Sequence, residues 1–229
     1  MASLDRAAVL ELAKPGGMPD EEVVERVRAG EVALFEILMR RHNQRLYRVA
    51  RAILGNDSEA EDVMQDAYVR AYRHMDQFEH RARFSTWLTK IAVHEALARL
   101  RRSRRFEVLD TVADGEDKAG GGFASSTRDP ERQMFDTEMK TLLETAIAAL
   151  PQEYRSVFVL REVEGMSTAE TAEALELSEE AVKTRLHRAR AMLQTTLYAH
   201  VGEAAPAAFH FHLSRCDRVV AAVLKRITA

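Results

Sequence analysis

The sequence has one cysteine, five prolines and only 7% aromatic residues, and these shortages exclude several protein classes. A single cysteine, Cys216, excludes internal disulfide bonds and favours a reducing, cytoplasmic location. Because no run of about 18 apolar residues occurs, we expect no membrane-spanning helix. The segment Met1–Lys14 has scattered charges and no apolar core, so it is unlike a secretory signal. We therefore expect a cytoplasmic protein.

Net charge is also nearly absent, since 33 Lys and Arg oppose 36 Asp and Glu over 229 residues. Taken alone, the net charge of −3 argues against a nucleic-acid partner. The charges are sorted, however. The segment Arg81–Arg105 holds eight basic residues and one acid, whereas Asp57–Glu79 and Phe106–Glu131 each hold seven acids and two basic residues. The small total therefore conceals a basic block between two acidic blocks.

Apolar residues recur at helical spacing through most of the chain, and strand-like alternation is nearly absent. A segment rich in Gly, Ser and Asp interrupts this pattern and is typical of a flexible linker. The sequence therefore predicts an all-α protein with two small helical domains. The expected divisions are an N-terminal extension (1–19), a first domain (20–105), an acidic flexible linker (106–130), a second domain (131–198) and a C-terminal extension with an amphipathic helix (199–229).

Helix ends in the first domain are marked by small and polar residues. Gly30 predicts a break between two helices, and Gly55 predicts the end of the second. Ser58–Glu61 has the pattern of a capping box, in which the Ser side chain and the Glu side chain satisfy amides at a helix start. A further helix is expected from about Phe84 to Arg105.

The second domain contains the pattern of a helix-turn-helix. Ser167–Glu170 predicts a capped short helix to Leu175, and Ser178 predicts the cap of the next helix. That helix turns apolar residues inward and basic or polar residues outward, as a DNA-reading helix does. Glu176 stands where such a turn usually has Gly. The alternative is an ordinary helical hairpin with a charged outer face.

The basic block belongs to a helix that also carries Phe84 and Trp87. Basic side chains bind phosphates by releasing counterions, and aromatic rings can stack on unpaired bases. Two alternatives remain open: the basic run as a solvated face, and Trp87 as part of the apolar core.

In combination these segments resemble bacterial RNA polymerase sigma factors of the extracytoplasmic-function (ECF) type in the primary-sigma superfamily. Asp57–Phe78 is similar to region 2.2, Ala82–Arg105 to regions 2.3 and 2.4, and Leu150–Leu193 to region 4. The resemblance implies a transcription initiation factor that binds core polymerase, recognises the −10 and −35 promoter elements and assists strand opening. It also implies control by an anti-sigma factor, and no enzymatic activity, cofactor, metal or small-molecule substrate.

The resemblance assigns residues to three surfaces. Asp62, Gln65 and Asp66 would contact core polymerase at the beta-prime clamp helices. The −10 strand would be bound by the loop 77–83 together with Phe84, Ser85, Trp87, Lys90, Arg101, Arg102, Arg104 and Arg105. The −35 duplex would be bound by Lys183, Thr184, Arg185, Arg188 and Arg190. His94 and Ala98 depart from the residues that many relatives have, which are Asn and Asp.

Two other classes of function are considered. A helix-turn-helix regulator that binds DNA without polymerase would have no need of the Asp57–Phe78 helix. An enzyme would need a phosphate-binding loop or a nucleophile and base, and neither pattern is evident. In the C-terminal extension, His210, His212 and Cys216 are residue types that suit zinc, but their spacing is not a strong zinc signature, and plain packing is the alternative.

Overall fold

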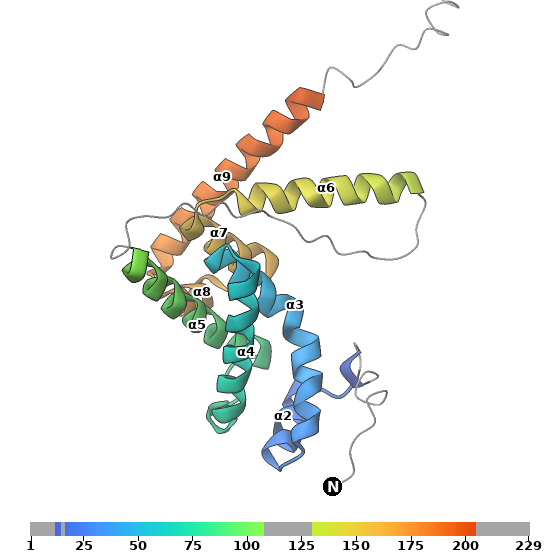
Figure 1. The fold of residues 1–229 in the computed structure, drawn as a ribbon, viewed down its shortest axis with the longest axis vertical. Helices are drawn as coiled ribbons and strands as arrows, with labels where there is room; N and C mark the ends of the chain where they lie inside the picture. Colours follow the sequence, from blue (N-terminus) through green and yellow to red (C-terminus); the bar gives the residue numbers. More distant parts are fainter. Residues whose placement is uncertain (1–11, 15–16, 108–129, 205–229) are drawn as a thin grey trace, which may run out of the picture.

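The computed structural model describes residues 12–14, 17–107 and 130–204, and all regular elements in these ranges are helical (Figure 1). This confirms the predicted all-α fold. The elements are α2 (Asp20–Arg28), η1 (Val32–Leu34), α3 (Phe35–Leu54), α4 (Asp57–Arg73), η2 (Met75–Gln77), α5 (Phe84–Glu107), α6 (Pro130–Ala148), α7 (Gln152–Phe158), a π-helical turn η3 (Val159–Val163), α8 (Thr168–Leu175) and α9 (Glu179–Ala204). The predicted C-terminal helix and its candidate metal ligands lie outside the described residues.

The first bundle, α2 to α5, has a continuous apolar core. Its helices α3, α4 and α5 pack against one another, and α2 packs on α3 (Figure 1). The largest fully buried side chains of this core are Phe84, Leu34, Ile37, Leu38, Leu46 and Leu88. Because the sequence places these residues on one side of each helix, the bundle follows directly from the apolar pattern.

The helix ends in the first bundle follow local chemistry. Gly55 ends α3 in the left-handed conformation, with φ of 81°, as its position after the last apolar residue predicts. The predicted capping box at Ser58 is wrong, because the N-cap of α4 lies two residues earlier in the chain. Asn56 is the N-cap, because its extended backbone lets its side chain accept from the Glu59 amide at 3.0 Å. Asn is as good an N-cap as Ser, so the two candidates could not be ranked by residue type.

The second bundle, α6 to α9, contains the predicted helix-turn-helix in α8 and α9. The Ser167 side chain accepts from the Glu170 amide, and the Glu170 side chain accepts from the Ser167 amide at 2.7 Å, so this capping box is confirmed. The hydrogen bond from the Ser167 backbone amide is the main cause that lowers the pKa of Glu170. Ser178 caps α9 by accepting from the Ala181 amide at 3.1 Å. Glu176 takes the left-handed conformation, with φ of 57°.

Two small apolar clusters hold the second bundle together. One joins α6 and α7 to α9, and the other joins α7, α8 and the start of α9. The helix α9 continues to Ala204, past the predicted domain end at residue 198. Its last turns extend beyond the other helices, and α6 extends from the bundle in a different direction (Figure 1). Each of these clusters is smaller than the core of the first bundle.

A third cluster is shared by the two bundles. Leu160, Met166 and Ala174 of the second bundle are buried against α3, α4 and α5. Their partners in the first bundle are Val49, Ala50, Ile53, Ala60, Val63, Val93 and Ala96. The sequence suggested two tethered domains, but in the structure the bundles pack on each other. The apolar residues of the shared cluster belong to helical stripes that each bundle uses for its own core, so periodicity does not distinguish the two roles.

Candidate polymerase and nucleic-acid interfaces

The candidate polymerase-binding residues lie on the outer face of α4. Asp62, Gln65 and Asp66 are all exposed, as expected from their place opposite the apolar stripe. Arg99 of α5 donates to Asp62 at 2.6 Å, so this carboxylate also ties α4 to α5. Asp66 forms no ion pair with any side chain in the described part of the chain. Gln65 and Asp66 are therefore the more accessible part of this face.

Exposed apolar residues continue the same face towards the end of α4. Val69 is 49% exposed and Tyr72 is 40% exposed, and Val32 of η1 is 49% exposed near the start of α3. Val69 and Tyr72 were not among the predicted residues, because the resemblance assigns only polar residues of this face to polymerase binding. The spacing of three and four residues from Asp62 through Asp66 to Val69 is the signal that could have found the first of them.

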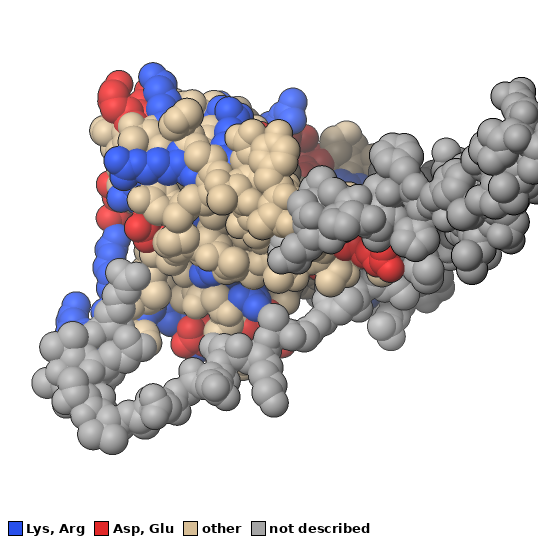
Figure 2. Space-filling view, turned by 90° about the horizontal axis from the view of Figure 1, so that it is seen from above, with Lys and Arg blue, Asp and Glu red and all other residues tan. Residues whose placement is uncertain are grey.

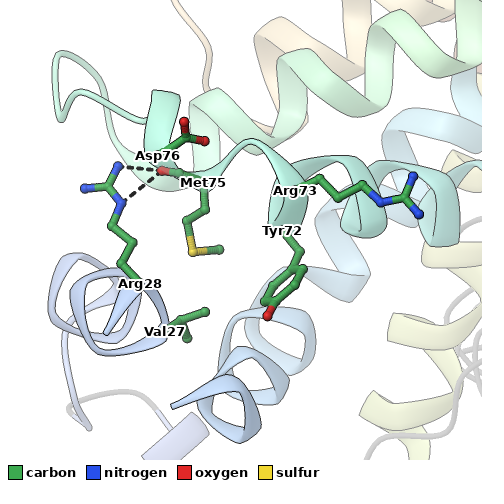
Figure 3. Close-up of a pocket in the computed structure, with 6 residues that line it drawn as sticks. All are labelled: Val27, Arg28, Tyr72, Arg73, Met75 and Asp76. Carbon is green, nitrogen blue, oxygen red and sulfur yellow. Dashed lines mark hydrogen bonds between the residues drawn. The ribbon is translucent and has the colours of Figure 1, made fainter. Parts of the chain in front are cut away.

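A pocket of about 620 Å³ lies next to this end of α4, between α2 and η2. Figure 3 shows the side chains of Val27, Met75 and Tyr72 pointing into the same space, with Arg73 turned away. Arg28 closes one wall, because its guanidinium donates to the Met75 carbonyl at 3.0 Å (Figure 3). It also donates to the Phe78 carbonyl at 2.6 Å. These bonds fix the turn between α4 and α5.

The N-terminal part of α5 holds four of the candidate −10 residues. Phe84 is only 1% exposed and packs in the core, whereas Ser85, Trp87 and Lys90 are half-buried. The Trp87 ring lies 5.4 Å from the Phe78 ring and 5.7 Å from the Phe84 ring. Phe84 therefore supports Trp87 from beneath, and its own ring does not reach the surface.

A second pocket, of about 210 Å³, opens beside Trp87. Its lining comes from the end of α4, from η2 and from α5: Arg70, His74, Gln77, Trp87, Ile91 and His94. The pocket joins the predicted loop residue Gln77 to Trp87 and adds His74 and Arg70, which the sequence analysis did not select. An aromatic wall next to hydrogen-bonding side chains suits a planar polar ring such as a nucleobase.

The C-terminal part of α5 carries the remaining candidates. Arg101, Arg102 and Arg105 are exposed, and Arg104 lies in the same helix. Two of the basic residues of α5 are engaged with the second bundle: Lys90 pairs with Glu173 at 2.6 Å, and Arg101 pairs with Glu176 at 2.6 Å. The candidate DNA-binding face of α5 is therefore partly occupied by acids.

The candidate −35 residues lie on α9. Val182, Leu186 and Ala189 are buried, and this turns Lys183, Thr184 and Arg188 outward. The remaining two differ in setting: Arg185 is half-buried, and Arg190 is exposed and pairs with Glu162 at 2.6 Å. The exposed side of α9 thus offers cations and a hydroxyl, and these donors match the acceptor atoms that guanine presents in a major groove.

Charge on the surface is mixed. On the face in Figure 2, Lys and Arg gather along one margin with Asp and Glu among them, and the centre is largely uncharged. Within the described ranges, no group of three or more His, Cys, Asp or Glu side chains is placed to hold a metal ion. No described helix has the combination of length and hydropathy that a membrane span requires.

Two protein-family models match the chain in the order in which the bundles occur. The model for Sigma-70 region 2 matches residues 38–106, and the model for Sigma-70, region 4 matches residues 140–193. Both matches contain candidate residues: the first covers α4 and nearly all of α5, and the second covers α8 and the first half of α9.

Curated relatives match most of the chain. The ECF RNA polymerase sigma factor SigW of Bacillus subtilis is 31% identical over 177 residues, which are 76% of this chain and 94% of the relative. The ECF RNA polymerase sigma-E factor of Escherichia coli is 32% identical over 176 residues, covering 76% of this chain and 91% of the relative.

Two solved structures are also similar. CnrH in complex with the cytosolic domain of CnrY is 27% identical with a TM-score of 0.50, covering 79% of this chain and 97% of that one. The sigma factor RpoE in complex with the anti-sigma factor NepR from Bartonella quintana is 22% identical with a TM-score of 0.57, covering 72% and 96%, and supports the fold.

Proposed function

The chain belongs to the sigma-70 family as an ECF RNA polymerase sigma factor, and from this premise we propose which residues carry out its function. The protein is a transcription initiation factor that binds core RNA polymerase and directs it to promoters. One observation carries this conclusion: regions 2 and 4 occur in order on one chain that is 31% identical to an ECF sigma factor over 94% of that relative's length.

For core polymerase, the proposed docking surface is the outer face of α4. Gln65 and Asp66 are exposed there, and Asp62 is exposed while it pairs with Arg99. Val69 and Tyr72 extend this face with apolar area, and exposed aromatic residues are enriched at protein-binding surfaces. The partner surface would be the beta-prime clamp helices.

For the −10 element, the proposed site is the pocket beside Trp87. An unstacked base could enter between Trp87 and the side chains of His74 and Gln77. Unstacking costs a few kcal/mol, which stacking on Trp87 and hydrogen bonds would offset. Lys90, Ser85, Arg101, Arg102, Arg104 and Arg105 would hold the strand, mainly through its phosphates. Phe84 would act indirectly, by holding Trp87 in place.

For the −35 element, the proposed reader is the exposed face of α9. Lys183, Thr184 and Arg188 are turned outward by the buried residues on the other side of the helix. Arg185 and Arg190 lie within the same three turns. An α-helix fits the major groove of B-DNA, so these side chains would meet base edges and phosphates.

We also propose that an anti-sigma factor controls the protein, which would act in the cytoplasm with polymerase and promoter DNA. The similar protein CnrH was solved in complex with a domain of a second protein, CnrY. A partner of that kind would have to cover α4, α5 or α9 to block the surfaces described above.

Run-off transcription with purified core polymerase tests the function and the docking surface together. The informative variant is Asp66→Lys, because Asp66 has no ion pair in the described ranges and its loss disturbs no internal contact. Charge reversal should weaken core binding by about tenfold or more, since it replaces attraction by repulsion at an interface. Glu138→Lys is the matched control, because Glu138 is an exposed acid near the middle of α6, in the second bundle, and has no ion pair among the described residues.

The outcomes separate the candidate functions. Promoter-specific transcripts that require both the protein and core polymerase support a sigma factor. Specific DNA binding with no effect of polymerase would indicate a free-standing helix-turn-helix regulator. If Asp66→Lys binds core polymerase as the control does, the docking surface on α4 is wrong, whatever the result for transcription.

A further inference from the structure

The apolar face of α6 continues beyond the point where it packs on α9. Ala146 and Leu150, near the C-terminal end of α6, share a cluster with Ala189 and Leu193 of α9. From this cluster the two helices extend in different directions (Figure 1). The contact with α9 therefore covers only the last turns of α6.

Three more apolar residues lie on the same face of α6. Met139, Leu142 and Leu143 precede Ala146 by seven, four and three residues, so all four side chains lie along one side of the helix. Met139 is 41% exposed and Leu143 is 40% exposed, and neither belongs to an apolar cluster of the described residues. We call Met139, Leu142 and Leu143 the α6 stripe, an apolar surface that the described part of the chain leaves uncovered.

The sequence after α9 contains apolar residues at the same spacing. Their positions follow the pattern i, i+3, i+4 and i+7, which the α6 stripe and Ala146 also follow: Val220, Val223, Leu224 and Ile227. These residues lie outside the described part of the chain. An isolated helix shorter than about 12–15 residues is marginal in water, so residues 217–229 would be helical only where their apolar side is buried.

The charges of the two segments are complementary. Helix α6 (Pro130–Ala148) has four acids and two basic residues, whereas Arg215–Ala229 has four basic residues and one acid. Opposite net charges favour contact between the two segments. Two copies of α6 would bring like charges together, which disfavours pairing of the α6 stripe with the stripe of a second molecule.

The connection between α9 and this segment is long enough to reach the α6 stripe. Ala146 and Leu193 lie in one cluster, and packed helices are about 10 Å apart. From there the rise is about 16 Å along α9 to Ala204 and about 10 Å along α6 to Met139. Residues 205–216 span up to about 40 Å when extended, which exceeds the longest path between these two ends.

We propose that residues 217–229 form a helix that packs on the α6 stripe of the same chain. The segment adds apolar area to the cluster of Ala146 and Leu193, which is small in the described bundle. The C-terminal extension is therefore part of the second bundle and covers its exposed apolar face. This inference concerns the packing of the second bundle and does not depend on the residues proposed to bind polymerase or DNA.

The first experiment uses the single cysteine of the chain. Cys216 lies one helical turn before Val220, so a second cysteine on α6 gives a protein with only two thiols. Met139→Cys and Leu143→Cys are made separately in the full chain, because the direction of the docked helix decides which position is nearer to Cys216. The matched control is Thr141→Cys, since Thr141 is exposed on the opposite side of α6.

The reagent is a short bis-maleimide, and a denaturing gel separates cross-linked monomers from dimers. At least one stripe variant should form the cross-linked monomer about tenfold faster than Thr141→Cys, because docking raises the local concentration of the second thiol. Equal rates for the stripe variants and the control would overturn the proposal. Cross-linked dimers in place of monomers would also overturn it, since a second copy would then occupy the stripe.

The second experiment tests which side of the C-terminal segment makes the contact. Val220→Asp places a carboxylate in the apolar pattern, and Ala222→Asp places the same group on the opposite side of the proposed helix. Each is combined with the faster-reacting cysteine variant. Val220→Asp should reduce the cross-linking rate to that of Thr141→Cys, whereas Ala222→Asp should retain the higher rate. Equal cross-linking rates for the two variants would contradict the proposed contact.

Small-angle X-ray scattering gives a measure that needs no added cysteine. Val220→Asp should have a larger radius of gyration than Ala222→Asp, because its C-terminal segment no longer packs on α6. The same radius for both variants would count against docking. Run-off transcription with the unaltered protein is read separately: its failure would contradict the proposed function, and the cross-linking result would still decide whether the segment docks.

Discussion

The two bundles differ in how completely each forms its own core. The first bundle buries large side chains such as Phe84, Leu46 and Leu88 among its own helices. The second bundle has only two small clusters and buries Leu160 and Met166 against the first. Small domains bury a low fraction of their surface, so a second bundle of this size gains stability by packing on a neighbour. The difference shows that contacts between the bundles stabilise the second bundle more than the first.

The two helices proposed to bind DNA also differ in their contacts with the other bundle. On α5, Lys90 and Arg101 pair with acids of the other bundle. On α9, Arg190 pairs with Glu162 of its own bundle, and Lys183 forms no ion pair within the described residues. The packing of the bundles therefore covers part of the proposed −10 surface and leaves the proposed −35 surface exposed. Substitutions at three positions test this comparison.

The largest effect is expected at the core of the first bundle. Phe84→Ala removes an almost fully buried ring that contacts Phe78 and Trp87, and it should lower the free energy of unfolding by about 3–5 kcal/mol. Urea denaturation followed by circular dichroism measures this loss.

Phe84→Leu separates packing from base stacking. Leu keeps much of the buried volume, so this variant should retain most of the stability and most of the transcription activity. Full stability with transcription lost would show that Leu cannot replace the Phe84 ring in function, either because the ring orients Trp87 or because it contacts DNA itself.

An intermediate effect is expected in the shared cluster. Leu160→Ala should cost roughly 2–4 kcal/mol, and it should also loosen the contact between the bundles, because Leu160 packs against α3. The control is Leu193→Ala, which removes the same atoms from a cluster that belongs to the second bundle alone. Scattering should show a larger radius for Leu160→Ala only. The same radius for both variants would remove the distinction between shared and internal packing.

The smallest effect is expected at the turn of the helix-turn-helix. Glu176→Gly relieves the left-handed strain and loses an exposed ion pair, so the free energy of unfolding should rise by up to about 1 kcal/mol. Calorimetric melting measures this change. A clear drop in melting temperature would mean that the ion pair to Arg101 outweighs the strain, and that the bundles are held more firmly by surface charge than we expect.

Local structure was predictable where it depends on neighbouring residues. The helix-turn-helix, its Ser167 cap and the Gly55 helix end follow from residue type and spacing. The cap of α4 was misassigned to Ser58, because Asn56 and Ser58 are equally good caps and only backbone conformation selects between them. The position of Asp62 on the outer face was predictable, but its pair with Arg99 was not, since that contact depends on how α4 and α5 cross.

The sequence by itself determined the helices, the order of the two bundles, the family, and which side chains face outward on α4 and α9, because these depend on periodicity and local capping. Tertiary structure alone decided that Phe84 is buried beneath Trp87, that His74 and Gln77 share a pocket, and that the acids of α8 cover α5. The physical reason is that the acid contacts of α8 join residues 83 and 75 positions apart, and that the other contacts depend on how helix faces cross whose apolar stripes fit more than one partner. The charged residues show both contributions. The sequence places acidic and basic residues in separate blocks, and the fold brings the acids of α8 onto the basic block of α5.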